Sequence, residues 1–257
     1  MCVVYAKVKG MKHRVQLLFL LIVVFTRIHK KDFRAGSLLV IAPHPDDEVL
    51  GVGGVMISAL ERKQNVHILY LTEGEATRAD PDPETIRKKR KHLSEAVRKY
   101  LDIPSHHIHH FYLTDGKVSR AGSEHFDAIV SRLRELIDGL KPDQVFATHE
   151  FDFWPFDHVA CAELARAAVA RSTYKPQLIY YWVWAWYNLR PWRLRLKQHP
   201  GLRRVDISRW STAKRKLVSL YLDPKSPSGV PWSGHLPKVL HQSVHFKFEV
   251  IEVMEEK

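Results

Sequence analysis

The chain has 257 residues, of which 45% are hydrophobic and 26% are charged. These proportions exclude a disordered chain, a collagen-like repeat and a multi-span membrane protein, and the length suits one or two domains with a sizeable core. The 40 Lys and Arg exceed the 28 Asp and Glu, so the formal net charge is +12. No zinc-finger, RRM or recognition-helix pattern accompanies this charge, and we therefore expect no nucleic-acid partner.

An apolar run, LLFLLIVVF, occupies residues 17–25 between two groups of basic residues. It is shorter than the roughly 20 residues that span a bilayer. Three interpretations stay open: a helix packed on the domain, an interfacial anchor on an anionic membrane, and a signal peptide, although no A-x-A-like cleavage site follows. We expect an N-terminal segment over 1–31 and a domain over 32–257. We expect a cytoplasmic protein, with membrane association through this segment left open.

Apolar runs typical of buried strands alternate with stretches of helical periodicity along the next 150 residues. The strands are predicted at 37–42, 66–71, 108–113, 144–148 and 178–184, and the helices at 48–62, from 83, at 126–139 and at 159–170. This alternation indicates βαβ units and a mainly parallel sheet. The domain is expected to continue to about residue 175, with a C-terminal extension packed on it. Ligands of such sheets bind at the carboxyl ends of the strands.

The segment Pro43-His44-Pro45-Asp46-Asp47-Glu48 stands where the first strand ends and a helix begins. His44 and Asp47 can converge on one ion and offer the nitrogen and oxygen ligands that suit Zn²⁺, with Asp46 facing the same cavity. The alternative is that the acids only cap the helix, where negative charge is favourable. A helix needs one cap, however, and three adjacent acids repel one another. The glycines that follow, beginning with Gly51, indicate close approach of a backbone or a ligand.

A second polar segment, residues 148–158, follows the fourth predicted strand and can reach the same edge of the sheet. A catalytic zinc site needs a third protein ligand and an open fourth position. We assign His158 as that ligand, with Asp157 orienting the site without binding the ion. Taken alone, His158 would read as an ordinary histidine at a helix start.

The strand-PHPDDE-helix unit, with the distal Asp157-His158-Val159-Ala160, resembles the PIG-L/LmbE family of zinc-dependent N-deacetylases. Shorter segments agree in family order, namely residues 72–76, 115–116 and 214–221, so that the resemblance covers roughly 37–222. It implies an α/β fold, a Rossmann-like three-layer sandwich with a mainly parallel sheet and the active site at the carboxyl ends of its strands.

The resemblance implies that His44, Asp47 and His158 bind Zn²⁺ and that Asp46 is the general base that activates the zinc-bound water. Asp157 matches the acid before the last histidine of the family motif and is predicted to be catalytic.

One position departs from the family pattern. Pro155 stands where the family commonly has a histidine thought to stabilise the oxyanion, and a proline side chain cannot donate a hydrogen bond. We take His149 as a candidate substitute and predict it to be catalytic.

The implied activity is a zinc-dependent hydrolase that removes an acetyl group from an N-acetylated sugar or sugar conjugate. The alternatives are a metal-dependent amidohydrolase acting on a non-acetyl amide, and a basic protein that binds membrane or nucleic acid.

Residues 180–197 interleave Trp and Tyr with Arg. They suit sugar stacking or a membrane interface, or else a buried strand. We therefore expect a peripheral membrane contact through 15–31 and 180–197 and, with it, a lipid-linked sugar as one form of substrate.

Overall fold

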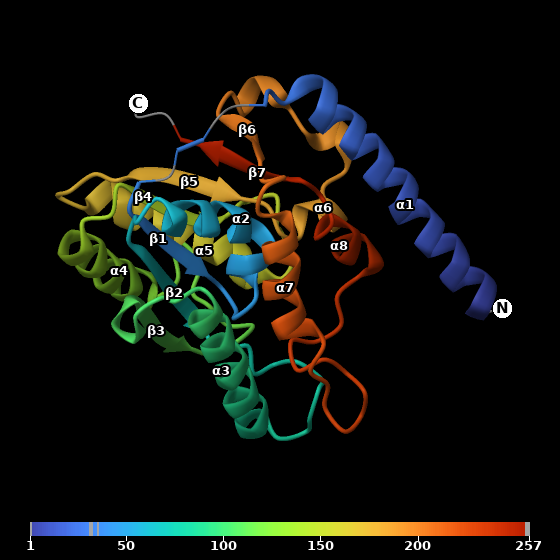
Figure 1. The fold of residues 1–257 in the computed structure, drawn as a ribbon, viewed down its shortest axis with the longest axis horizontal. Helices are drawn as coiled ribbons and strands as arrows, with labels where there is room; N and C mark the ends of the chain where they lie inside the picture. The colour runs from blue at the N-terminus through green and yellow to red at the C-terminus, as the bar shows by residue number, and fades with distance from the viewer. Residues whose placement is uncertain (1, 31–32, 35, 255–257) are drawn as a thin grey trace.

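The computed structural model of the chain describes residues 2–30, 33–34 and 36–254, with side chains from residue 14 onward (Figure 1). A seven-stranded sheet lies at its centre, in the order β3-β2-β1-β4-β5-β7-β6. Strands β1 to β5 pair in parallel, and β7 pairs antiparallel with both β5 and β6. The strands are β1 (Leu38–Ala42), β2 (Val66–Thr72), β3 (Ile108–Leu113), β4 (Gln144–Thr148), β5 (Gln177–Tyr181), β6 (Leu202–Asp206) and β7 (Phe248–Val253).

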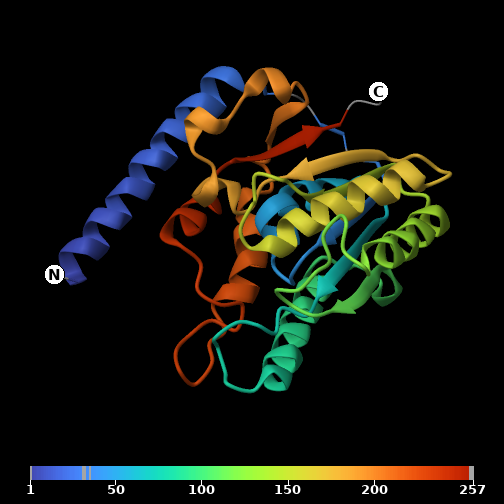
Figure 2. The ribbon, with the colours of Figure 1, turned by 180° about the vertical axis from the view of Figure 1, so that it is seen from behind.

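Helices cover both faces of the sheet, so the predicted three-layer α/β sandwich is confirmed. One face carries α2 (Asp47–Glu61), α3 (Pro83–Tyr100) and α7 (Ser211–Leu222), and α7 packs on both of the others. The opposite face carries α4 (Phe126–Leu140) and α5 (Phe156–Arg171), which lie in front of the sheet in Figure 2. The shorter helices are α6 (Ala185–Asn188), α8 (Lys238–Ser243) and the 3-10 turns Ser105–His107, Pro191–Arg193 and Leu196–Gln198.

Strand β1 is buried on both faces, which explains its uninterrupted apolar sequence. Leu38 and Val40 join the core under α2, whereas Leu39 and Ile41 join the core under α4 and α5. Because successive side chains of a strand point to opposite faces, one short apolar run supplies both cores. The backbone of β1 therefore holds the residues that follow it at a fixed position.

The glycines of α2 allow this helix to lie close against its neighbours. A Cβ atom at Gly51 would come within 2.2 Å of the Tyr181 ring, and one at Gly54 within 2.6 Å of Ile207. Close approach was the predicted role of these glycines. The partners are side chains of the core.

The C-terminal part of the chain completes the sheet, which the prediction of a packed extension did not anticipate. Strands β6 and β7 form its far edge, and Glu249 of β7 accepts hydrogen bonds from the backbone amides of Gly54 and Val55 in α2. The buried Lys214 of α7 also contacts Glu249, at 2.7 Å. The middle of α2 is thus fixed by residues far away in the sequence.

The aromatic run after β5 is buried, which confirms the buried-strand interpretation for its first half. Strand β5 ends at Tyr181, three residues earlier than predicted, and the side chains of Trp182, Trp184 and Trp186 fill the core. The prediction that these side chains contact a membrane is therefore wrong. Trp192, further along, is 73% exposed.

The N-terminal apolar run belongs to α1 (Cys2–Arg27), which projects from the body of the molecule (Figure 1). Leu17, Leu20 and Val24 are buried against the domain, and Gln16 donates hydrogen bonds to the backbone carbonyls at positions 187 and 189. Within the described ranges, no helix is long and apolar enough to cross a membrane. The predicted boundary between residues 31 and 32 lies outside the described residues.

Candidate metal centre and active site

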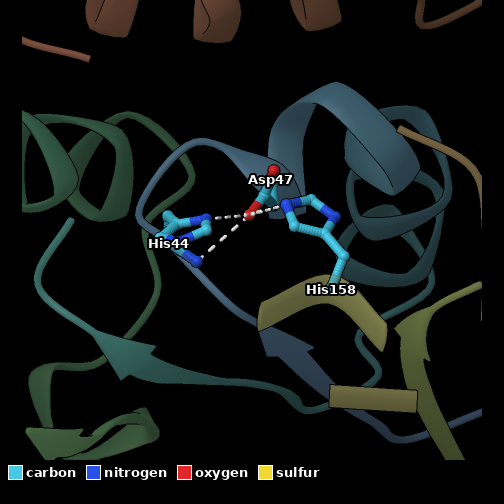
Figure 3. A group of neighbouring side chains, drawn as sticks. All are labelled: His44, Asp47 and His158. Carbon is cyan, nitrogen blue, oxygen red and sulfur yellow. Dashed lines mark hydrogen bonds and ion pairs between the residues drawn. The ribbon is translucent and has the colours of Figure 1, made fainter. Parts of the chain in front are cut away.

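Three of the predicted side chains meet at the carboxyl edge of the sheet (Figure 3). His44 follows β1, Asp47 begins α2, and His158 lies in the first turn of α5, which follows the neighbouring strand β4. One carboxylate oxygen of Asp47, Oδ2, lies 3.1 Å from His44 Nδ1 and 3.3 Å from His158 Nε2. The three potential ligand atoms lie within 4.8 Å of one another. The structure thus brings together the residues predicted to bind zinc.

The outward-facing nitrogens of both imidazoles contact further carboxylates. His44 Nε2 lies 3.1 Å from Asp115 Oδ1 and 3.3 Å from Asp157 Oδ2, and His158 Nδ1 lies 3.2 Å from Asp152 Oδ2. A histidine that donates one ring N–H to a carboxylate presents its other nitrogen unprotonated, which is the usual arrangement around metal ligands. Asp157 therefore orients His44, in agreement with its predicted position outside the coordination shell.

The orienting carboxylates have their own hydrogen-bond donors. Asp157 accepts hydrogen bonds from the backbone amides of Gly116, at 2.7 Å, and Val118, at 3.1 Å. Asp115 accepts one from the amide of Ala76, at 2.7 Å. These backbone amides hold both carboxylates in position beside His44 Nε2.

Negative charge dominates the site. Burial opposes ionisation of Asp47, but the His158 and His44 imidazoles lower the pKa of this carboxyl below its usual range. Burial also opposes protonation of His158, yet Asp47 and Asp152 raise the pKa of this histidine to about 9. Carboxylates thus outnumber imidazoles in a buried volume, an arrangement that a bound cation would neutralise.

The donor set fits a zinc ion. Two imidazole nitrogens and one carboxylate oxygen are among the ligands that zinc uses in catalytic sites with one open position. His158 Nε2 is buried and contacts Asp47 Oδ2 at 3.3 Å without forming a well-aligned hydrogen bond. A buried nitrogen whose hydrogen bond is not made is costly in a protein, and coordination to a cation would satisfy it.

Asp46 lies beside the candidate ligands in an unusual backbone conformation. Its φ of 126° is rare for a residue other than glycine, and such strain is found more often at functional sites. Its carboxylate is 5% exposed and lies 3.5 Å from the buried guanidinium of Arg90. Burial raises the pKa of Asp46 well above its usual range, against the opposing charge of Arg90.

A cavity of about 330 Å³ opens onto this group. Its walls come from the five loops that follow β1 to β5, from helices α2 and α3, and from the segment before α8. The lining residues are His44, Asp46, Asp47, Leu50, Ala76, Thr77, Arg90, Asp115, Trp154, Pro155, Trp184, Ser233, Gly234, His235 and Leu236. The charged groups in its lining suit a small polar ligand, and the aromatic side chains can pack against an apolar face of that ligand.

The structure does not bring His149 to this group. The imidazole is buried beyond the end of β4, where Nδ1 accepts the Phe151 amide hydrogen at 3.0 Å and Nε2 contacts Glu252 at 2.6 Å. His199 contacts the same Glu252 carboxylate, at 3.0 Å. Both ring nitrogens of His149 are thus engaged, Nδ1 within its own loop and Nε2 with β7. Pro155 lines the cavity without a histidine substitute from this position.

Glu48, the last residue of the acidic cluster, is a buried anchor outside the cavity. It accepts hydrogen bonds from the hydroxyl groups of Tyr70, at 3.0 Å, and Tyr221, at 2.7 Å. Burial raises the pKa of Glu48 to about 7, although these hydroxyl groups favour the ionised form. One of the three adjacent acids therefore serves the fold, while Asp46 and Asp47 face the site.

Sequence reasoning did not assign a role to several residues of the site. Asp115 was noticed only as part of an Asp-Gly pair, and Asp152 lies inside the second polar segment without a distinguishing pattern. Arg90 lies in a highly charged stretch of the helix predicted from residue 83, yet its side chain is buried and lines the cavity. His235 reaches the cavity from the C-terminal segment.

Comparison with known proteins agrees with this geometry. Residues 39–169, about half of the chain, match the PIG-L family, described as GlcNAc-PI de-N-acetylase. The chain belongs to this family. The matched residues include His44, Asp46, Asp47, Asp157 and His158, so the PIG-L segment contains the whole candidate centre.

Relatives of this PIG-L protein include a probable N-acetyl-alpha-D-glucosaminyl L-malate deacetylase 2 of Bacillus subtilis strain 168. It is 33% identical over 145 residues, which are 54% of this chain and 61% of that protein. The matched segment thus spans less than two thirds of its relative.

Solved structures share the fold at low identity. N,N'-diacetylchitobiose deacetylase from Pyrococcus horikoshii superposes with a TM-score of 0.63 at 18% identity, over 86% of this chain and 84% of its own. GalB, the 4-carboxy-2-hydroxymuconate hydratase of Pseudomonas putida KT2440, gives a TM-score of 0.62 at 15% identity, over 86% of this chain and 97% of its own. Because the same fold accommodates a deacetylase and a hydratase, the fold alone does not define the reaction.

Proposed function

We propose that the protein is a zinc-dependent hydrolase that removes the acetyl group from an N-acetylated amino sugar or its conjugate. The observation that carries this proposal is the convergence of His44, Asp47 and His158 on one point, with Asp46 beside them in the lining of the cavity. Membership of the PIG-L family and the deacetylase activity named for the Bacillus subtilis relative support the same reaction.

The residues present divide the reaction between them. When bound to His44, Asp47 and His158, a zinc ion supplies Lewis-acid polarisation of the carbonyl and lowers the pKa of water to about 7. Asp46 takes the proton of the water whose oxygen attacks the acetamide carbon. As the carbon–nitrogen bond breaks, Asp46 returns this proton to the departing amine, so that acetate and a free amino sugar are formed.

Neighbouring groups keep these residues in position. Asp157 and Asp152 hold the two imidazoles by the nitrogens that face away from the centre. Arg90 hydrogen-bonds the backbone carbonyl of Pro45 and lies beside Asp46, so it fixes the loop that carries the general base.

The substrate we infer is of the N-acetylglucosamine type. The aromatic side chains of Trp154 and Trp184 pack edge to face, at 4.9 Å between ring centroids, and both line the cavity. Such surfaces stack on the apolar face of a sugar ring. The group attached to the sugar determines whether the natural substrate is a water-soluble conjugate or a lipid-linked one, and both are compared in the test.

The test is acetate release by the zinc-loaded full chain. We expect release from N-acetylglucosaminyl conjugates, including the malate conjugate and a lipid-linked form in detergent, and loss of release after chelation with recovery on adding zinc. Replacing the acetyl group by a bulkier acyl group in the same conjugate distinguishes a deacetylase from an amidohydrolase of other specificity. A zinc-loaded protein that releases no acetate from any member of this panel would contradict the proposal.

A further inference from the structure

Helix α1 exposes an apolar face on the side turned away from the domain. The exposed fractions of its members lie between 48% and 58%, and we call them the α1 face: Val15, Leu18, Phe19, Ile22 and Phe25. Their spacing places them on one side of a helix, opposite the buried Leu17, Leu20 and Val24. Soluble monomers seldom leave a contiguous apolar surface of this kind uncovered.

The surface around the α1 face is rich in basic residues, and the acid beside it, Asp206, is paired with Lys30 at 2.7 Å. The 3-10 turn Pro191–Arg193 packs against α1 and exposes Trp192 by 73%. Neither residues 14–30 nor residues 187–205 contain an Asp or Glu. Together the two stretches carry nine Lys and Arg, namely Arg14, Arg27, Lys30, Arg190, Arg193, Arg195, Lys197, Arg203 and Arg204. We call these nine the basic border of the α1 face.

We propose that the α1 face and its basic border bind the surface of an anionic lipid bilayer, with α1 lying in the plane of the interface. Leucine, phenylalanine and tryptophan bordered by Lys and Arg are the composition of helices that insert one face between lipid headgroups. The anionic headgroups would neutralise the border, and each such cation strengthens binding about five-fold. This binding is independent of the reaction at the metal centre.

A second copy of the chain fits this surface less well. Pairing two α1 faces would bring two basic borders together in a protein whose net charge is already +12, and in each border Asp206 offsets only one of the nine cations, Lys30. Like charges held next to each other oppose such an interface. The available charge thus favours a partner with an extended negative surface.

The structure also connects this surface to the catalytic cavity. Gln16 of α1 bonds to the backbone carbonyls of Tyr187 and Leu189, and Asn188 between them donates to the carbonyl of Trp154 at 2.6 Å. Trp154 lines the cavity and is 49% exposed. These hydrogen bonds link α1 to one wall of the cavity.

Co-sedimentation of the full chain with vesicles tests the proposal. We expect the protein to sediment with vesicles made of equal parts of phosphatidylcholine and phosphatidylserine, less at high salt, and little with phosphatidylcholine alone. The double variant Leu18→Ser with Phe19→Ser should lose this binding. Tyr100→Ser is the matched control, because Tyr100 is a similarly exposed aromatic residue on α3. Circular dichroism checks that each variant folds.

A charge-reversal pair tests the basic border. Arg193→Glu with Arg195→Glu should weaken binding to the anionic vesicles by at least about twenty-fold. Lys88→Glu with Lys99→Glu makes the same change in net charge on α3 and should leave binding nearly unchanged.

The proposal is overturned if the Leu18→Ser, Phe19→Ser variant binds the anionic vesicles as strongly as the unmodified protein does. It is also overturned if the unmodified protein is a dimer, the Leu18→Ser, Phe19→Ser variant is a monomer, and neither protein binds vesicles. Acetate release from a water-soluble conjugate without vesicles should be unaltered by all of these substitutions, which separates this outcome from failure of the proposed reaction.

Discussion

Asp46 is the residue whose replacement most directly tests the chemistry. An Asp46→Asn side chain keeps the size and backbone position but cannot take a proton from water. We expect acetate release to fall at least about 100-fold, which is the usual contribution of a general base. Zinc content, measured by mass spectrometry, should stay at one ion per chain, because Asp46 is not in the ligand group.

The control for this substitution is Asp127→Asn, in which an exposed carboxylate on α4 undergoes the same chemical change. Both activity and zinc content should then match the unmodified protein. Unimpaired turnover by Asp46→Asn would remove Asp46 from the proposed role.

At the scale of single residues, the sequence was most informative where polar residues directly follow an apolar strand. His44, Asp46 and Asp47 could be placed at a sheet edge for this reason, and the next polar segment supplied His158. Asp152 could not be predicted, because it acts through contacts with His158 and with the backbone amides of residues 183 and 185 that only the tertiary fold creates.

His149 shows the opposite limit. Its proximity to His158 along the chain suggested a shared site, but the turn after β4 directs His149 toward β7. Distance along the sequence therefore does not determine which side of a strand end a side chain reaches.

At the scale of elements, the contact between α2 and the sheet depends on the absence of a side chain at Gly51. Gly51→Ala would place a methyl group 2.2 Å from the Tyr181 ring, and the Tyr181 hydroxyl is held by the Ile41 carbonyl at 2.9 Å. We expect overpacking to lower the free energy of unfolding by about 1–3 kcal/mol. Thermal unfolding followed by circular dichroism measures this loss as a lower Tm.

Gly139→Ala is the matched comparison, because Gly139 lies in α4 and a Cβ atom there would meet nothing within 4 Å. This substitution should raise the free energy of unfolding by about 0.4–1 kcal/mol, since alanine restricts the unfolded chain. Equal Tm values for the two variants would show that close packing at Gly51 does not limit stability.

The five strands and four α-helices between residues 37 and 181 were predicted with their types correct, because buried parallel strands have apolar runs and the helices between them have clear periodicity. The strand at 144–148 has the predicted bounds. Strands β6 and β7 were missed. In β7, Glu249 and Glu252 interrupt the apolar pattern, and they are buried only because Lys214 and His149 pair with them.

At the scale of the whole molecule, the two signs of charge are separated. The chain is strongly basic, yet the candidate centre gathers five carboxylates around two imidazoles, namely Asp46, Asp47, Asp115, Asp152 and Asp157. Mutual repulsion among buried carboxylates destabilises the fold unless a cation compensates for it. Stability should therefore depend on metal.

Zinc binding should thus raise the thermal stability of the protein. An ion present at about 100 times its dissociation constant adds about 2.7 kcal/mol, because it binds the folded chain alone. For a protein of this size we expect Tm to rise by roughly 5–10 °C between chelator-treated and zinc-loaded samples in differential scanning calorimetry.

His158→Ala should abolish this zinc-induced rise in Tm, because the variant lacks one ligand. Asp152→Asn should shift the required zinc concentration upward by about 10- to 100-fold, because the orienting carboxylate is lost. His149→Ala is the control, because His149 is buried but is not a proposed ligand. The Tm of this variant without zinc should fall, while the zinc-induced rise in Tm should persist. A full zinc-induced rise in His158→Ala would contradict the ligand assignment.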